Sequence, residues 1–185
     1  MSVLDHKVKE SLSGSAHSVV VFLHGYGANG ADLLSLADPL AEHMPDTTFY
    51  APDAPELCPG NPGGYQWSPI PFMDGSSEEE ARAGRERSAA ELNAYLDDIL
   101  VDHDLEPSQM ALVGFSQGTM MALQIGPRRE DALAGIVGFS GRLLEPEMLL
   151  EETRSRMPIL LAHGDQDPVL PPEALPAALR ALQEA

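Results

Sequence analysis

The sequence is poor in cysteine and in long apolar runs. Its single cysteine, Cys58, excludes an intramolecular disulfide and suits a reducing compartment. No apolar run approaches the roughly 20 residues that a membrane-spanning helix needs. The first ten residues are polar and charged, unlike a secretory signal peptide. Together these absences predict a cytoplasmic protein without stable membrane insertion.

Basic residues are also scarce. The 185 residues include 11 Lys and Arg against 29 Asp and Glu, which gives a formal net charge of −18. Such a surface repels polyanions and anionic membranes, so nucleic acid is excluded as a partner. We interpret the acidic excess as a well-hydrated surface that favours solubility, and it indicates no partner by itself.

Short apolar segments alternate with helix-like ones, which predicts an α/β fold with a mostly parallel central sheet and helices on both faces. Residues 19–23 read VVVFL, typical of a strand buried on both faces. We see no internal repeat or linker, so residues 1–185 are expected to form a single domain. Further strands are predicted at 47–50, 110–113, 134–138 and 158–162, with a weakly alternating edge strand at 3–8.

Two helices have clear signals. Apolar residues lie on one face of 31–43, although Pro39 is expected to kink or split this helix. Ser77 followed by Glu80 spells a capping box, and the apolar stripe behind it extends to Ile99. Further helices are predicted at 118–125 and 172–182.

Residues 51–76 interrupt this alternation with many prolines and glycines. A connection of this length is uncommon in a compact domain unless it covers or lines a site. It carries large apolar residues such as Trp67 and Phe72. Two interpretations stay open: the wall of a substrate groove, or a loop packed on the core for stability alone.

Residues 114–118 spell G-x-S-x-G around Ser116. The string follows a predicted strand directly and leads into a predicted helix, which is the setting of a nucleophile elbow. The glycines permit a sharp turn, because a Cβ there would collide with neighbouring backbone. The helix N-terminus behind the serine favours developing negative charge. Ser116 is therefore the predicted nucleophile, and the alternative is a helix N-cap serine.

Acyl transfer to a serine also needs two donors for the oxyanion. One is expected to be the backbone N–H of Gln117, and the other to come from the loop after an early strand. Residues 24–27 follow the strand 19–23 in this position. His24 is interpreted as bracing this loop. In folds with a nucleophile elbow, the catalytic base follows the nucleophile and the acid in chain order, whereas His24 precedes both.

The acid is expected in the loop after strand 158–162, where Asp165 and Asp167 are both candidates. Their spacing does not choose between them. A metal site that combines them with His163 is disfavoured, because alternating acids in a short turn usually hydrogen-bond the backbone. We expect no metal and no cofactor.

Taken together, these motifs resemble the carboxylesterase/phospholipase branch of the α/β-hydrolases, which includes acyl-protein thioesterases. The resemblance implies Asp167 as the triad acid, backbone N–H groups of Tyr26 and Gln117 as the oxyanion hole, and substrate contacts at Trp67 and Met120. The matching segments occur in the family's order across nearly all of the chain: FLHGYG at 22–27, PDAP at 52–55, Trp67 in its loop, GFSQG at 114–118 and HGDQDP at 163–168.

The resemblance also implies the reaction. Family members hydrolyse carboxylic esters of short to medium acyl chains through an acyl-serine, here on Ser116. The expected partner is a small-molecule ester or thioester. An acyl-protein thioesterase is the nearest alternative function.

One part of the family's pattern has no counterpart. All six histidines precede Asp167, whereas the family has a further strand, a Gly-His loop and a final helix after the acid. We favour a histidine beyond Ala185; a truncated, inactive acyl- or lipid-binding relative and an earlier histidine in the same role are the alternatives. Without the further strand an apolar sheet edge is open, and such an edge favours association, for example as a homodimer.

Overall fold

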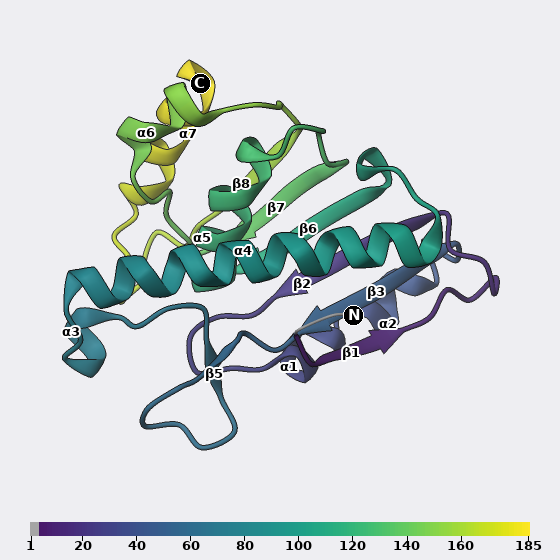
Figure 1. Cartoon of the computed structure of the whole chain (residues 1–185), viewed down its shortest axis with the longest axis horizontal. Coiled ribbons are helices and arrows are strands. Elements are labelled where there is room, and N and C mark those ends of the chain that lie inside the picture. Colours follow the sequence, from purple (N-terminus) through teal and green to yellow (C-terminus); the bar gives the residue numbers. More distant parts are fainter. Residues whose placement is uncertain (1–3) are drawn as a thin grey trace.

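The computed structural model describes residues 4–185. Its main sheet has six strands in the order β1-β3-β2-β6-β7-β8 (Figure 1). All neighbouring strands are parallel except the antiparallel pair β1–β3, which confirms a mostly parallel sheet. The strands are β1 (His6–Lys9), β2 (Ser18–Leu23), β3 (Thr47–Pro52), β6 (Met110–Phe115), β7 (Gly135–Phe139) and β8 (Ile159–Ala162).

Each predicted strand is present within the described residues, with ends shifted by at most three residues. The expected edge strand begins at His6 rather than Val3, and Val3 lies outside the described residues. Within 51–76, β4 (Glu56–Leu57) and β5 (Tyr65–Gln66) form a small hairpin that is not among the predicted strands. This segment is therefore folded rather than open loop.

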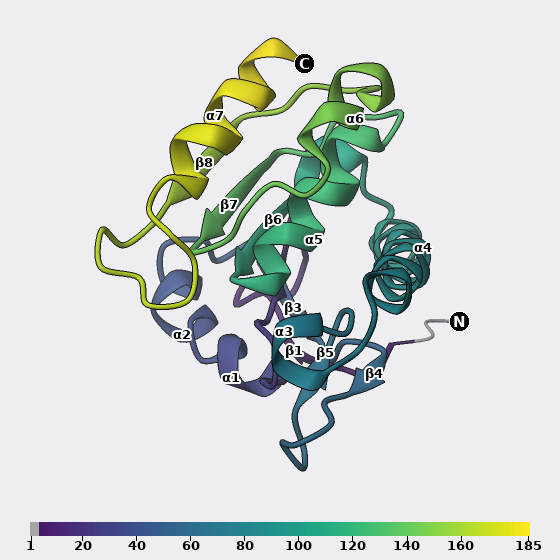
Figure 2. The same cartoon turned by 90° about the vertical axis from the view of Figure 1, so that its left-hand side faces the viewer.

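Helices lie on both faces of the sheet (Figure 2). They are α1 (Gly30–Leu34), α2 (Ala37–Ala41), α3 (Pro71–Asp74), α4 (Glu78–His103), α5 (Gln117–Ile125), α6 (Pro146–Glu152) and α7 (Ala174–Glu184), with 3₁₀ turns at Pro107–Gln109 and Gly126–Arg128. The predicted capping box at the start of α4 is formed reciprocally by Ser77 and Glu80. None of the helices between residues 4 and 185 has the length and apolarity to cross a bilayer.

The predicted helix 31–43 is split in two, as expected from Pro39. The break lies at Ser35 and Leu36, before the proline, which sits inside α2. Proline has no N–H, so residue 39 cannot donate to the Ser35 carbonyl and continue the helical ladder. The proline therefore interrupts the helix one turn before its own position in the chain.

Strand β2 explains why both faces are covered. Val19, Val21 and Leu23 belong to the larger apolar core with α4 and α5. Val20 and Phe22 belong to a second core on the opposite face, with α1 and α2. Side chains of a strand alternate between faces, so a continuous apolar run requires a cover on each side.

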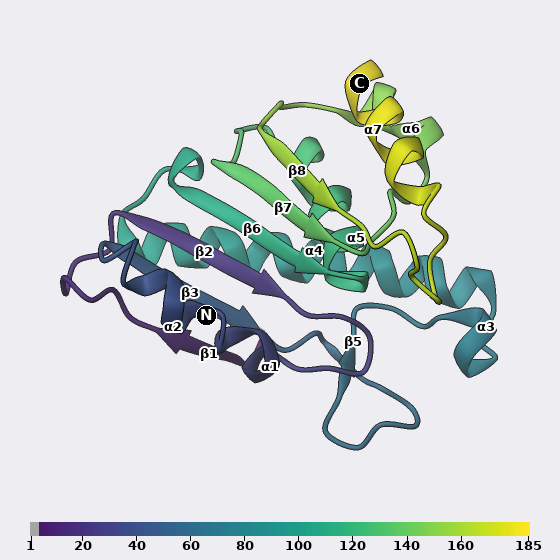
Figure 3. The same cartoon turned by 180° about the vertical axis from the view of Figure 1, so that it is seen from behind.

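Strands β7 and β8 are covered less completely. Seen from behind, no helix lies in front of their outer face (Figure 3). Phe139 is 42% exposed and Leu160 62% exposed on this face. No strand of the described residues pairs with the free side of β8. Within residues 4–185 the side of β8 that faces away from β7 is therefore unpaired.

Candidate active site

Ser116 lies between β6 and α5 in a strained conformation. Its φ of 52° and ψ of −114° are rare for a residue with a side chain. The turn is held by a hydrogen bond of 2.8 Å from the Ser116 amide to the Phe139 carbonyl. Strained non-glycine backbone of this kind clusters at active sites. The predicted strand–turn–helix elbow is present in the structure.

The two glycines that flank the serine are required by space. A Cβ on Gly114 would lie 2.5 Å from the Thr119 backbone nitrogen. A Cβ on Gly118 would lie 1.9 Å from the Leu23 carbonyl oxygen. Both distances are below any normal contact with carbon. The G-x-S-x-G spelling therefore reflects the close approach of α5 to β6 and β2.

A cavity of about 470 Å³ opens beside Ser116. It lies at the carboxyl ends of the parallel strands, where open α/β sheets bind their ligands. Its lining is largely apolar and includes the predicted substrate contact Met120. The walls come from the 25–28 loop, the 68–73 segment, α4, α5, the 142–144 segment and the 169–171 loop.

The predicted oxyanion donors border the same cavity. Tyr26 and Gln117 both line it, and a Cβ on Gly25 would lie only 3.3 Å from the Ser116 Cβ. Gln117 is the first residue of α5, so its backbone N–H has no intrahelical acceptor. The arrangement is compatible with two N–H groups near the serine, and their catalytic role remains a prediction.

His24 is fully buried behind this loop. Its Nε2 accepts from the Ala54 amide at 3.0 Å, so Nδ1 carries the hydrogen and donates to the Gly25 carbonyl at 2.7 Å. Burial lowers the pKa of the imidazole and keeps it neutral. Since both ring nitrogens are engaged, the geometry favours a bracing role over a role as base.

The side chain of Gln117 connects the elbow to the 51–76 segment. Its Oε1 accepts from the Trp67 amide at 2.8 Å, and its Nε2 donates to the Ser68 carbonyl at 2.8 Å. The Trp67 indole N–H donates to the His24 carbonyl at 3.0 Å. The sequence predicts a role only for the backbone N–H of Gln117, because no local signal identifies the partners of its side chain.

Trp67 needs a correction. It is completely buried and is absent from the cavity lining, so it is not placed to contact substrate. Its indole N–H has its acceptor inside the protein, which fixes the ring beneath the groove. The residues after it line the cavity instead, from Ser68 to Met73. The 51–76 segment thus forms one wall of the groove, while its tryptophan supports that wall.

Of the two aspartates in the loop after β8, Asp167 is the one whose side chain is hydrogen-bonded to the backbone. Its Oδ1 accepts from the amides of Leu170 and Val169, both at 2.9 Å. These bonds lower the pKa of the carboxyl and keep it ionised. Asp165 is exposed, with no side-chain hydrogen bond found within residues 4–185. The geometry supports Asp167 over Asp165, and its role as triad acid remains a prediction.

The lowered pKa of Asp167 predicts a pH-dependent stability. Folding favours the ionised form, so the stabilisation is present at neutral pH and is lost as pH falls below the ordinary value of 3.8. We expect Asp167→Asn to lower the unfolding temperature at pH 7, with a difference from wild type that shrinks below about pH 4. Thermal melts from pH 3 to 7 measure it, with Asp165→Asn as an exposed control. A difference that stays constant across this range would contradict the assignment.

A general base is not placed by the described residues. No histidine ring among residues 4–185 hydrogen-bonds to the Ser116 hydroxyl. His24 is engaged as above, and His163 Nε2 lies 3.1 Å from the Leu170 carbonyl and 3.7 Å from Asp167 Oδ2. The structure therefore gives no support to an earlier histidine in this role.

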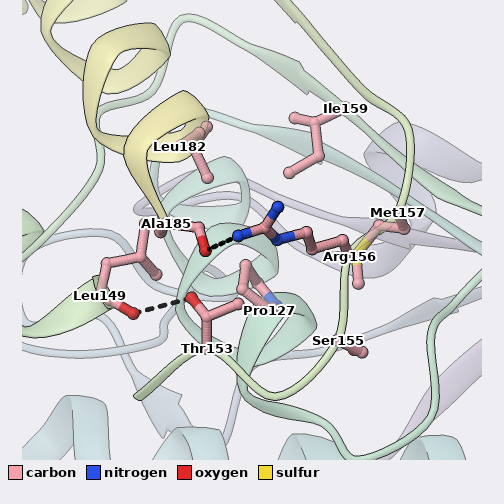
Figure 4. A pocket seen from close by; sticks show the side chains of 9 residues that line it. All are labelled: Pro127, Leu149, Thr153, Ser155, Arg156, Met157, Ile159, Leu182 and Ala185. Carbon is pink, nitrogen blue, oxygen red and sulfur yellow. Dashed lines mark hydrogen bonds between the residues drawn. The ribbon is translucent and has the colours of Figure 1, made fainter. Parts of the chain in front are cut away.

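A second cavity of about 190 Å³ lies at the other end of α5 (Figure 4). Its lining includes Pro127, Leu149 and Ile159, and Arg156 donates to the Ala185 carbonyl beside it. This is the amino edge of the parallel strands, opposite to the edge where such sheets bind ligands. The cavity contains no acid or histidine, so we do not assign catalysis to it.

Comparison with known proteins supports the sequence resemblance. The family model described as phospholipase/carboxylesterase matches residues 4–185. Acyl-protein thioesterase 1 of Saccharomyces cerevisiae is 31% identical over 166 residues, covering 84% of this chain and 73% of the yeast protein. Esterase YpfH of Escherichia coli is 27% identical over 184 residues, covering 98% of this chain and 75% of its own length.

Solved structures agree with the fold. The crystal structure of esterase PE8 is similar with a TM-score of 0.92 and 43% identity, covering 98% of this chain and 84% of that one. The carboxylesterase of Bacillus cereus has a TM-score of 0.72 at 21% identity, covering 98% of this chain and 80% of its own, and bears on the fold alone. The predicted α/β-hydrolase fold is confirmed.

Proposed function

Since this chain belongs to the phospholipase/carboxylesterase family of α/β-hydrolases, we propose that it cleaves carboxylic esters of short to medium acyl chains through an acyl intermediate on Ser116. The observation that carries the proposal is the strained Ser116 at the carboxyl edge of the sheet, exposed to a largely apolar cavity. The decisive test replaces Ser116 by alanine and measures the loss of ester hydrolysis.

In the proposed reaction, Ser116 Oγ attacks the acyl carbonyl carbon. The negative oxygen of the tetrahedral intermediate accepts hydrogen bonds from the backbone N–H groups of Tyr26 and Gln117. One such donor typically contributes about 10²- to 10³-fold in rate. The alcohol then leaves, and water hydrolyses the acyl-serine. Asp167 would orient the imidazole that moves the proton, and this proposal assigns that imidazole to none of the six histidines.

The cavity supports an acyl chain as the group bound next to the serine. Met120 and Met121 of α5 line it on one side, and Ile70, Phe72 and Met73 line it from the 68–73 segment. Methionine side chains adapt to apolar ligands of variable shape. Beneath this wall, the hydrogen bonds of Trp67 keep the segment against the elbow.

An acyl-protein thioesterase is the second candidate, favoured by the names of several relatives and by the exposed Phe72 and Met73 at the groove. We expect a higher kcat/KM for p-nitrophenyl octanoate than for an acidic S-octanoyl cysteine peptide, because the acidic surface of the protein repels an acidic peptide. Matched octanoyl groups isolate the leaving group. A clear preference for the peptide would favour the thioesterase.

We also propose a cytoplasmic location, supported by the buried free thiol of Cys58, which suits a reducing compartment. Association into a homodimer remains a prediction.

A further inference from the structure

The charged residues of the active-site cavity differ in balance from the rest of the protein. Acidic residues outnumber basic ones 29 to 11 in the sequence. The charged residues of the cavity lining are Glu78, Arg85 and Arg142, so basic side chains are in excess there. This reversal occurs at the place where a substrate has to bind.

Arg142 is held close to the nucleophile by its neighbour in the chain. Gly141 packs so tightly that a Cβ on it would lie 3.0 Å from the Ser116 carbonyl oxygen and 2.4 Å from the Thr119 Cβ. The backbone of Arg142, the next residue, therefore begins directly beside the elbow at Ser116. Its side chain is exposed and lines the cavity.

The other two charges have compensation. Arg85 Nη2 lies 3.3 Å from Glu145 Oε1, in an ion pair that is partly buried on the arginine side. Glu78 lies in the first turn of α4, where the helix dipole favours a negative charge. Within residues 4–185 the guanidinium of Arg142 has neither an ion pair nor a hydrogen bond. It is the cation of this cavity that is free to bind a ligand.

The strongly negative surface does not cancel this local charge. At physiological ionic strength, exposed charges more than about 8 Å apart are largely screened. The guanidinium of Arg142 lines the same cavity as Ser116, so it gives a bound substrate a positive charge inside the cavity. Its planar donors match a carboxylate or a phosphate in bidentate geometry.

We propose that Arg142 selects esters that carry an anionic group, a carboxylate or a phosphate, close to the scissile bond. This inference rests on the proposed ester hydrolysis at Ser116 and narrows its substrate class. Arg142 is the residue that determines this specificity. The anionic group can belong to the acyl part or to the alcohol part of the ester.

The test compares each anionic ester with a neutral ester of similar shape. For the acyl part, p-nitrophenyl hemiglutarate is paired with p-nitrophenyl 5-methylhexanoate; for the alcohol part, 4-acetoxybenzoate is paired with 4-acetoxyacetophenone. We expect Arg142→Gln to lower kcat/KM for the anionic member of one pair by about tenfold, as for one partly exposed charge-assisted hydrogen bond. The neutral member should change by less than about twofold.

Arg82→Gln is the matched control. It removes the same charge, and Arg82 is exposed on α4 and does not line the cavity. An equal loss for anionic and neutral esters, or the same loss in both variants, would overturn the proposal. If the wild-type protein hydrolyses none of the esters even with added imidazole as an exogenous base, the proposed function fails separately from the proposal on Arg142. Ligand-observed NMR then decides on Arg142, by testing whether Ser116→Ala binds monomethyl glutarate more tightly than the Ser116→Ala, Arg142→Gln double variant does.

Discussion

The Ser116→Ala variant is expected to lose at least about 10³-fold in the rate of p-nitrophenyl butyrate hydrolysis, because no acyl-enzyme can form without the hydroxyl. Release of p-nitrophenolate measures the rate, and far-UV circular dichroism checks that the variant is folded. Ser155→Ala is a matched control. The Ser155 hydroxyl is buried at the far end of α5 and has no hydrogen-bond partner among residues 4–185, so its removal should leave hydrolysis unchanged.

The remaining outcomes of this experiment separate the nucleophile from the base. If wild type is inactive, added imidazole supplies an exogenous base. Hydrolysis that imidazole restores in wild type but not in Ser116→Ala supports the nucleophile and identifies the base as the missing group. An acyl ligand that binds without any turnover, with or without imidazole, supports the inactive binding relative instead. Equal hydrolysis by wild type and Ser116→Ala contradicts the proposed function.

Among the glycine-to-alanine substitutions in this protein, Gly118→Ala is expected to destabilise the fold most. The added Cβ would lie 1.9 Å from the Leu23 carbonyl oxygen and 2.8 Å from that of His24. Both atoms belong to the backbone, at the end of β2 and the start of the 24–27 loop, so neither can move independently. We expect a loss of about 3 kcal/mol or more in the free energy of unfolding, from overpacking against backbone.

In a protein of this size, such a loss lowers the unfolding temperature by at least about 6 °C. Differential scanning calorimetry measures it. Gly164→Ala is the control, because the nearest atom to its added Cβ is 4.0 Å away. A shift in Gly118→Ala no larger than in the control would mean that α5 does not approach β2 as closely as described.

The sequence by itself determined the fold and the position of the nucleophile. The run at 19–23 predicts a strand covered on both faces, and the two cores confirm it. The G-x-S-x-G string between a strand and a helix predicts the turn at Ser116, whose strained φ the structure shows. These features are local: side-chain periodicity, capping and the steric need for Gly114 against the Thr119 backbone act between residues near one another in the chain.

Other features were decided only by the tertiary structure. Trp67 and Gln117 are fifty residues apart, and nothing near either one predicts that an amide oxygen will accept from the tryptophan backbone. For the same reason Trp67 was wrongly assigned to the substrate. Arg142 resembles any exposed arginine until Gly141 is seen packed against Ser116. Such roles depend on which distant segments meet at the carboxyl edge of the sheet. A local sequence pattern does not predict these contacts, because they are fixed by the joint packing of strands and helices around two apolar cores.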